Sequence, residues 1–277
     1  MVKKQLIMEK ALELFAKQGF EATSVQQITE HCGISKGAFY LSFKSKDELI
    51  MALINQFMMQ FTSDIDYVVK NSNTDELLYD FYYTSYSFFL QHSDFAKVFI
   101  KEQIQSFNEE FIEKIRYFDR LFDEIIQSMI ERLYGEETQE IKYDLGYCIK
   151  KFMGMYSELF FYYNVQMDIP LLVQSLVEKT NLIAKHMTIP FISNEFYQAY
   201  KKQVNEVEFT KKDILEMIDQ KLEEMDMSIE KESLILLKQE VSNPTLASVL
   251  VNGLLENIRN HPHCKWITYL LRSYFKL

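Results

Sequence analysis

The hydrophobic pattern of the first twenty residues is that of an amphipathic helix. Ile7, Ala11, Leu14 and Phe15 stand at positions i, i+4, i+7 and i+8, so they share one face of an α-helix. Gly19 follows this face, and glycine is typical of a helix end because it adopts the left-handed conformation without strain. The pattern therefore predicts a first helix that ends close to Gly19.

Two capping signals and one glycine divide the next residues into short helices. Thr23 begins the stretch TSVQ, which reads as a capping box, because its hydroxyl can accept a first-turn amide and Gln26 can reach back. Gly33 ends this second helix and permits the positive φ of a sharp turn. A third helix starts at Ser35, and another capping box at residues 45–48 opens a fourth. Two short helices joined by a tight glycine turn form a helix-turn-helix.

A helix-turn-helix places its second helix in the major groove of DNA, which is about 12 Å wide and admits an α-helix. Phe39 and Phe43 are four residues apart and are expected to face the core, which leaves Tyr40 outside with its hydroxyl available to a phosphate. The lysines that follow can act as countercharges to phosphates. The candidate DNA-binding residues are Thr23, Ser24, Ser35, Lys36, Gly37, Ala38, Tyr40, Lys44 and Lys46.

The charge of the chain is distributed unevenly. The formal net charge is -10, yet residues 1–46 contain seven lysines and only four glutamates. The remaining residues contain 23 basic and 36 acidic side chains, which phosphate groups would repel. Any contact with nucleic acid is therefore expected at the N-terminal segment alone, and its affinity should fall steeply as salt is added.

This N-terminal pattern resembles the DNA-binding head of the TetR family of bacterial transcriptional regulators. The resemblance covers about the first fifty residues and includes the stretch GISKGAFYLSFKSKDEL at residues 33–49. Two positions depart from the family pattern: Thr29 stands where alanine is common, and Leu41 stands where a polar or aromatic residue often contacts DNA. The resemblance implies DNA contacts for Lys36, Gly37, Tyr40 and Lys46.

The rest of the chain continues with helical periodicity and little turn punctuation, since the whole sequence contains only seven glycines and four prolines. The predicted fold class is all-α: a three-helix DNA-binding head at 1–46, a helical ligand-binding and dimerisation bundle at 47–190, and an additional C-terminal helical segment at 191–277. Further helices are predicted at 46–70, 75–91, 94–106, 108–134, 137–167, 170–187, 194–207, 210–225, 228–241, 244–260 and 265–275.

The family resemblance also implies a function. It implies a body that binds a small molecule and a homodimer that pairs through helices at about 137–187. A dimer presents two heads about one helical turn of DNA apart, as a palindromic operator requires. We expect a ligand-responsive repressor that a hydrophobic or lipophilic cationic effector releases from DNA, with efflux genes as possible targets by analogy. Residues 191–277 are expected to add a helical layer to the body, or else to form a separate partner-binding module.

The predicted body is rich in aromatic residues. The run FYYTSYSFF at residues 81–89 surrounds a helix with rings, so some rings must face a cavity, a partner or solvent. Two interpretations stay open: the rings pack the core and a dimer interface, or they line a pocket with an acid such as Glu158 for a cation. The candidate ligand-binding residues are Phe89, Phe99, Phe118, Phe122, Met153, Tyr156 and Phe160.

Signals for other protein classes are weak. Three cysteines lie far apart without CxxC spacing, and the stretch HPHC at 261–264 is more typical of a loop than of a metal site. The sequence lacks GxGxxG, GxxxxGK[ST], GxSxG and HExxH, and no histidine follows a glutamate at the spacing of a di-iron site. We therefore expect no metal, no cofactor and no catalytic site. The alternatives are a helical protein-interaction module or an enzyme without DNA binding.

The sequence also bears on location. The N-terminal apolar residues are interrupted by charges, unlike a signal peptide, and the longest uncharged runs are too short to span a bilayer. A cytoplasmic protein with no membrane partner is therefore expected.

Overall fold

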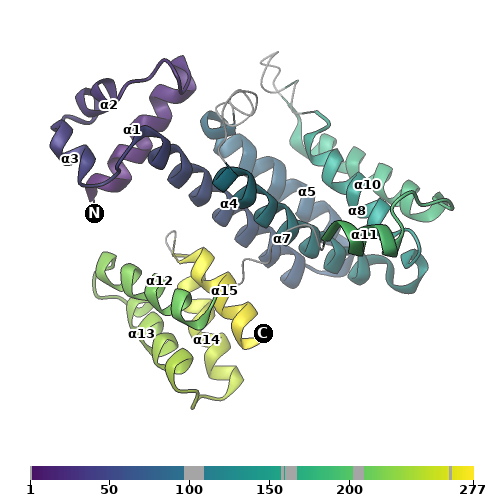
Figure 1. Cartoon of the computed structure of the whole chain (residues 1–277). Helices are drawn as coiled ribbons and strands as arrows, with labels where there is room; N and C mark the ends of the chain where they lie inside the picture. The colour runs from purple at the N-terminus through teal and green to yellow at the C-terminus, as the bar shows by residue number, and fades with distance from the viewer. Residues whose placement is uncertain (1, 97–108, 157–158, 160–166, 202–208, 262–263) are drawn as a thin grey trace. The chain divides into compact units, whose positions relative to one another are not determined.

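The computed structural model describes the chain except at residues 1, 97–108, 157–158, 160–166, 202–208 and 262–263. All regular structure in the described part is helical, which confirms the predicted all-α fold class (Figure 1). The chain divides into two compact units, residues 1–205 and residues 206–277. The finer boundaries predicted at residues 46 and 190 stay predictions. Among the described helices, none is long and apolar enough to cross a membrane.

Three helices form the head: α1 (Val2–Gln18) and the shorter α2 (Val25–Cys32) and α3 (Lys36–Tyr40). Gly33 has a φ of 67° and donates its N–H to the carbonyl groups of Thr29 and Glu30, which ends α2 in a left-handed turn. The side chains of Phe15, Ile28, Phe39 and Phe43 are buried between these helices. The predicted inward position of both phenylalanines of α3 and its turn is therefore confirmed.

The capping box of α2 lies one residue later than predicted. Ser24 is the N-cap: its hydroxyl accepts the N–H of Gln27 at 3.2 Å, and the Gln27 side chain accepts the Ser24 N–H at 2.8 Å. Thr23 is instead fully buried and donates its hydroxyl to the carbonyl of Gly19 at 2.7 Å. The stretch TSVQQ fits the box pattern in two registers, and burial of Thr23 against the end of α1 selects the second.

One long helix, α4 (Lys46–Asn71), connects the head to the body. It begins at Ser45, whose hydroxyl accepts the N–H of Glu48 at 3.0 Å, as the sequence predicts. Leu49 is buried in the first turn, and α4 packs against α1 near its start and against α5 (Thr74–Gln91) and α7 (Glu109–Tyr134) further along. Figure 1 shows α4 running from the head into the bundle.

The body continues with η1 (Gly135–Thr138), α8 (Lys142–Gly154), α10 (Ile169–His186) and α11 (Asn194–Lys201). The single helix predicted at 137–167 is wrong at its start, because α8 begins at Lys142. Helix α8 ends at Gly154, and the predicted end near residue 167 adjoins residues outside the described part. Gly135 has a φ of 54°, and the Thr138 carbonyl accepts the N–H of Ile141 at 3.0 Å, so tight turns precede α8. The predicted helix at 94–106 lies mostly outside the described residues.

Tyrosine hydroxyls join the helices of the body. The hydroxyl of the fully buried Tyr82 on α5 lies 2.8 Å from the Thr180 hydroxyl on α10, and burial raises the Tyr82 pKa. Tyr86 donates to the Phe152 carbonyl on α8 at 2.9 Å, and Tyr134 on α7 donates to Asn181 at 2.7 Å. These bonds satisfy polar atoms that would otherwise destabilise the interior, and they fix the register of α5 and α7 against α8 and α10.

The second unit is a small helical bundle of α12 (Lys211–Glu224), α13 (Ile229–Ser242), α14 (Ser248–Arg259) and α15 (Lys265–Phe275). It has a hydrophobic core of its own, formed by residues that include Ile218, Leu234, Leu237, Leu255 and Leu271. The described residues of this unit are helical, as the all-α prediction requires, whereas the extent of the predicted additional segment at 191–277 stays a prediction.

Helix α14 starts later than the predicted residue 244 because a buried carboxylate holds the preceding turn. Glu240 is 4% exposed, and its Oε2 accepts the backbone N–H groups of Thr245 at 2.8 Å and Leu246 at 3.0 Å. Amides directed at this carboxylate fix the chain in a turn ahead of α14. Hydrogen bonds to a charged acceptor are stronger than neutral ones, so this turn is well anchored.

We predict that Glu240→Gln destabilises the second unit by about 1 to 2 kcal/mol, because the amide keeps the shape but loses the charge on the acceptor. Trp266 is the single tryptophan of the chain and lies buried in α15, so its fluorescence reports this unit alone. In urea titrations of the full chain, the fluorescence midpoint should fall. Glu232→Gln on the exposed side of α13 is the matched control. Equal midpoints for both variants would contradict the prediction.

Candidate nucleic-acid interface

The tight turn and the N-cap of α3 position the candidate recognition helix. The Ser35 hydroxyl accepts the N–H of Ala38 at 3.2 Å, and the Leu41 N–H donates to the Gly37 carbonyl at 3.1 Å. Phe39 is fully buried and anchors the helix to the head core. Because successive helical residues are 100° apart, Gly37 and Leu41 lie on the side of α3 opposite to Phe39.

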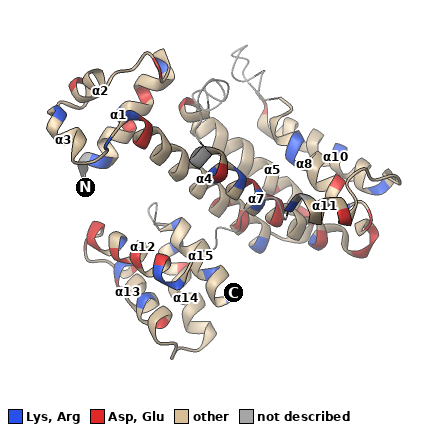
Figure 2. Ribbon diagram, viewed as in Figure 1, with Lys and Arg blue, Asp and Glu red and all other residues tan. Residues whose placement is uncertain are grey.

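The outward face of α3 and its following turn consists of exposed residues at helical spacing. Lys36, Gly37, Tyr40, Leu41 and Lys44 are all exposed. Helix α3 carries a cation and no acid, as Figure 2 shows by blue without red on its ribbon. The predicted contacts Ser24 and Ser35 are also exposed, whereas Ala38 is half-buried. The face formed by Lys36, Gly37, Tyr40, Leu41 and Lys44 is hereafter called the recognition face.

Gly37 is not required by the packing of the head. A Cβ atom built there would meet only the Ser35 Oγ, at 3.8 Å, which is an ordinary van der Waals distance. The structure gives Gly37 no positive φ, in contrast to Gly33. The glycine therefore serves no need of the fold that the described residues reveal, and it leaves the backbone of the recognition face open to close approach by a partner.

Two predicted contact residues have structural roles in the head. The Lys46 ammonium donates to the carbonyl groups of Phe20 at 2.7 Å and Glu21 at 3.4 Å and lies 4.1 Å from the centre of the Phe20 ring. A contact between Lys46 and phosphate would have to share or break these bonds. Thr23 is fully buried, so a DNA contact would require its hydroxyl to leave the Gly19 carbonyl.

A hydrogen bond between side chains joins α1 to α2. The Glu13 carboxylate lies 2.7 Å from Lys10 Nζ and 2.9 Å from His31 Nε2. Hydrogen bonds from Lys10 and His31 lower the Glu13 pKa, so the carboxylate stays charged at neutral pH. Lys36 reaches Gln26 of α2 at 3.4 Å, a long contact that leaves its ammonium largely available.

Aromatic rings of α4, α5 and α7 meet in the body. Phe61 lies 5.1 Å from Phe89 and 5.4 Å from Phe122, and Phe57 stacks on Phe95 at 4.0 Å between ring centres. We call these rings and Phe88 the ring cluster; Phe88 lies 4.9 Å from Phe57. Ring contacts of this kind stabilise the interior beyond their buried area.

The candidate ligand-binding residues are only partly brought together. Phe89, Phe122, Met153 and Tyr156 belong to one hydrophobic core. Phe118 is buried, with its ring 5.2 Å from Tyr117. Phe99, Phe160 and Glu158 are outside the described residues, so their predicted roles stay predictions.

Sequence reasoning missed Phe57 and Phe61, which form the α4 side of the ring cluster. Their spacing of four residues places both on one face of a helix, and that signal could have identified them. The fold decides that this face meets α5 and α7, which no local pattern encodes.

The carboxylates beside the rings of α7 are already paired. Lys150 Nζ on α8 lies 2.7 Å from both Asp119 and Asp123. Burial raises the Asp123 pKa, and the charge and hydrogen bond of Lys150 oppose this rise. The ammonium therefore occupies the position that a cationic ligand would need to take at these two acids.

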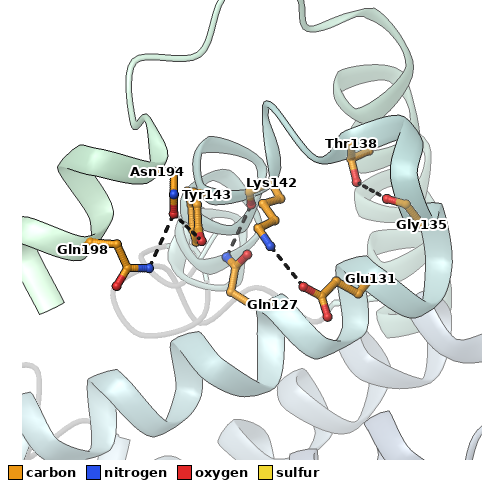
Figure 3. A network of polar contacts seen from close by, with 8 residues as sticks. All are labelled: Gln127, Glu131, Gly135, Thr138, Lys142, Tyr143, Asn194 and Gln198. Atoms are coloured by element: carbon orange, nitrogen blue, oxygen red, sulfur yellow. Dashed lines mark hydrogen bonds and ion pairs between the residues drawn. The ribbon is translucent and has the colours of Figure 1, made fainter.

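A polar network at the other end of α7 joins α8 and α11, and Figure 3 shows its members. Lys142 pairs with Glu131 at 3.1 Å, and its backbone carbonyl accepts from Gln127 at 3.3 Å. Tyr143 donates to Asn194 at 3.0 Å. The Tyr143 ring also stacks on Tyr197, outside the figure, at 4.1 Å. These contacts hold α11 on the body and not in the second unit.

In the described part of the chain, no three His, Cys, Asp or Glu side chains gather around one point. Cys264 is buried at the start of α15, with its sulfur 3.6 Å from His261 Nδ1. Burial raises the pKa of the Cys264 thiol to about 11, so the thiol stays protonated at neutral pH. His263 lies outside the described residues.

Comparison with known sequences identifies the head. Residues 7–53 match the profile of the family described as bacterial regulatory proteins, tetR family. Over 268 residues the chain is 25% identical to the uncharacterized HTH-type transcriptional regulator YerO of Bacillus subtilis. The matched region covers 92% of this chain and 89% of YerO. The unmatched remainder of the chain is shorter than residues 206–277, so the similarity extends into the second unit.

Comparison with solved structures concerns a smaller part of the chain. A transcriptional regulator of the TerR/AcrR family from Aquifex aeolicus matches with a TM-score of 0.52 and 25% identity, over 65% of this chain and 99% of that chain. The regulator FadR from Bacillus subtilis, solved in complex with stearoyl-CoA, matches with a TM-score of 0.56 and 20% identity, over 67% of this chain and 99% of its own. These neighbours share the fold of a large part of the chain.

We predict that Gly37→Ala weakens DNA binding while the stability of the head is unchanged or rises by up to about 1 kcal/mol, because alanine favours a helix. Gly33→Ala is the contrasting variant, since its positive φ makes alanine cost about 1 to 2 kcal/mol. Thermal unfolding by circular dichroism and DNA titration should separate the two effects. Loss of stability in Gly37→Ala would show that the glycine serves the fold.

We predict opposite consequences for two lysines of the head. Lys36→Met should leave the unfolding midpoint unchanged and reduce the slope of log affinity against log salt by about 1 per bound protomer. Lys46→Met should lower the stability by about 1 kcal/mol, because the Phe20 carbonyl loses its charged donor. An unchanged midpoint for Lys46→Met would refute its structural role.

Proposed function

The chain belongs to the TetR family of bacterial transcriptional regulators through its helix-turn-helix head, and from this premise we propose that it represses transcription as an effector-controlled dimer on a palindromic operator. The observation that carries the proposal is the recognition face: an exposed, basic helix face on a chain with a formal net charge of -10. A surface of this kind would gain little from protein packing but much from phosphates and base edges.

Dimerisation of the body is supported by exposed apolar side chains. Tyr147 of α8 and Leu171 and Leu182 of α10 are exposed, as are Ile189 and Phe191 beyond α10. Several large apolar side chains exposed within one stretch of a chain favour an interface. A second copy of the same helices would cover them and would place two heads on successive major grooves.

Helix α4 provides a physical route from effector to DNA. Its Leu49 is buried in the head, and its Phe61 is in the ring cluster, about 18 Å further along the helix axis. An effector that separates the rings would displace one end of α4, and a rigid helix would transmit this displacement to α3. DNA affinity would then fall by linkage, since the two ligands favour different conformations.

A neutral hydrophobic effector fits the described residues better than a cation. The rings supply apolar contacts, whereas Asp119 and Asp123 already bind Lys150. A cation would have to displace this lysine and leave its ammonium half-buried without a partner, which is costly. Control of efflux genes rests on analogy with the family alone.

The first experiment is selection of DNA from a randomised duplex library by the purified full chain, followed by gel-shift titration at two salt concentrations. Enrichment of a palindrome with salt-sensitive affinity well above that for random DNA is the expected result. Failure to enrich any sequence at either salt would favour a protein-interaction module or an enzyme without DNA binding.

Effector release can be measured on the selected operator. Decanol, a neutral apolar probe, should release the protein, whereas tetraphenylphosphonium, a lipophilic cation, should not. Stearoyl-CoA is a useful third probe because a protein of similar fold binds it. Phe89→Leu, at a half-buried ring of the cluster, should weaken the response to decanol while operator affinity is kept. Release by the cation alone would reverse our preference.

A further inference from the structure

Leu41 is an unexplained feature of the recognition face. Its side chain is 91% exposed, more than any other large hydrophobic side chain in residues 4–46. Exposure at this level means that the leucine gains almost nothing from the head core, since hydrophobic stabilisation scales with the area removed from water. The fold therefore does not require an apolar residue at this position.

The position of Leu41 defines what it can reach. The hydrogen bond from its N–H to the Gly37 carbonyl, 3.1 Å, sets it one helical turn after Gly37 on the same outward side. A Cβ at Gly37 would meet only the Ser35 Oγ, at 3.8 Å, and the glycine has none, so the backbone there can approach a surface closely. Leu41 follows about 6 Å along the axis, which corresponds to about two base-pair steps of DNA.

The chemistry of Leu41 restricts its partner further. A leucine side chain neither donates nor accepts hydrogen bonds, so it cannot pair with a phosphate or with the polar edges of bases. The major-groove edge of the four base pairs offers one apolar group, the C5-methyl of thymine. Neighbouring Tyr40 and Lys44 carry the polar groups suited to phosphate.

We propose that Leu41 determines operator specificity by contacting a thymine methyl group in each half-site. This inference rests on the proposed function, because it needs a DNA-bound recognition face. It also explains why Leu41 departs from the family pattern: at this position an apolar contact with a base replaces a polar or aromatic one. Discrimination of thymine is then expected at one position per half-site, about two base pairs from the base beside Gly37.

The test removes only the methyl group. Each thymine of the selected operator is replaced singly by deoxyuridine, which keeps every hydrogen-bonding group, and binding of the full chain is titrated. The wild-type chain should lose about fourfold in affinity at one thymine per half-site, the factor that corresponds to about 0.8 kcal/mol for one buried carbon group. Leu41→Ala should bind the thymine and deoxyuridine duplexes equally at that position.

Two controls make the test specific. Leu41→Met keeps an apolar side chain of similar reach and should keep the sensitivity to deoxyuridine. Tyr40→Phe should weaken binding to all duplexes alike and leave the same thymine sensitive. Circular dichroism melts should be equal for the wild type and Leu41→Ala, because the removed side chain is almost fully exposed.

The outcomes separate this inference from the proposed function. If no single deoxyuridine replacement in the selected operator changes the affinity of the chain, the role of Leu41 is overturned while the chain remains a DNA-binding regulator. Equal losses of affinity on deoxyuridine replacement for the wild type and Leu41→Ala would also overturn this role. They would show that another residue contacts the thymine methyl group. Selection that enriches no DNA would overturn both proposals together.

Discussion

The helix α4 is the constraint on which the described structure of residues 1–205 depends. Leu49 in its first turn completes the core of the head, and Phe57 and Phe61 in its middle meet the rings of α5 and α7. At its far end, Arg132 of α7 donates to the carbonyl groups of Val69 and Ser72 and so satisfies groups that a helix C-terminus leaves open. A helix held at three points along its length moves as a rigid element. That property makes it suited to couple an effector to DNA.

The head separates side chains that serve the fold from those available to a partner. Lys46 and Lys36 are both cations in the same motif, but Lys46 is held by two carbonyl groups and a ring, whereas Lys36 is exposed with one long contact. Likewise, Gly33 is needed for a left-handed turn, whereas Gly37 leaves room for a Cβ. Identical residue types in one short motif thus have different physical reasons to be present.

The second unit has a core and an anchored turn of its own, so its stability does not need to come from the first unit. The similarity to YerO extends into it, whereas the solved neighbours match about two thirds of this chain while nearly all of their own residues are covered. The sequence similarity to YerO therefore extends into the second unit, whereas these solved regulators leave about a third of this chain unmatched.

The sequence by itself determined the helical fold class, the helix-turn-helix and most helix bounds, because periodicity, caps and glycines act within a few residues of each other. Tertiary structure decided what these local signals leave open. Burial of Thr23 chose the capping register at Ser24, and the Glu240 carboxylate delayed the start of α14. Packing of α4 brought Phe57 and Phe61 to the rings of α5 and α7. The ion pairs of Lys150 with Asp119 and Asp123 likewise join α8 to α7. Each of these outcomes depends on contacts between residues distant in the sequence or on burial that such contacts create, which a local pattern does not contain.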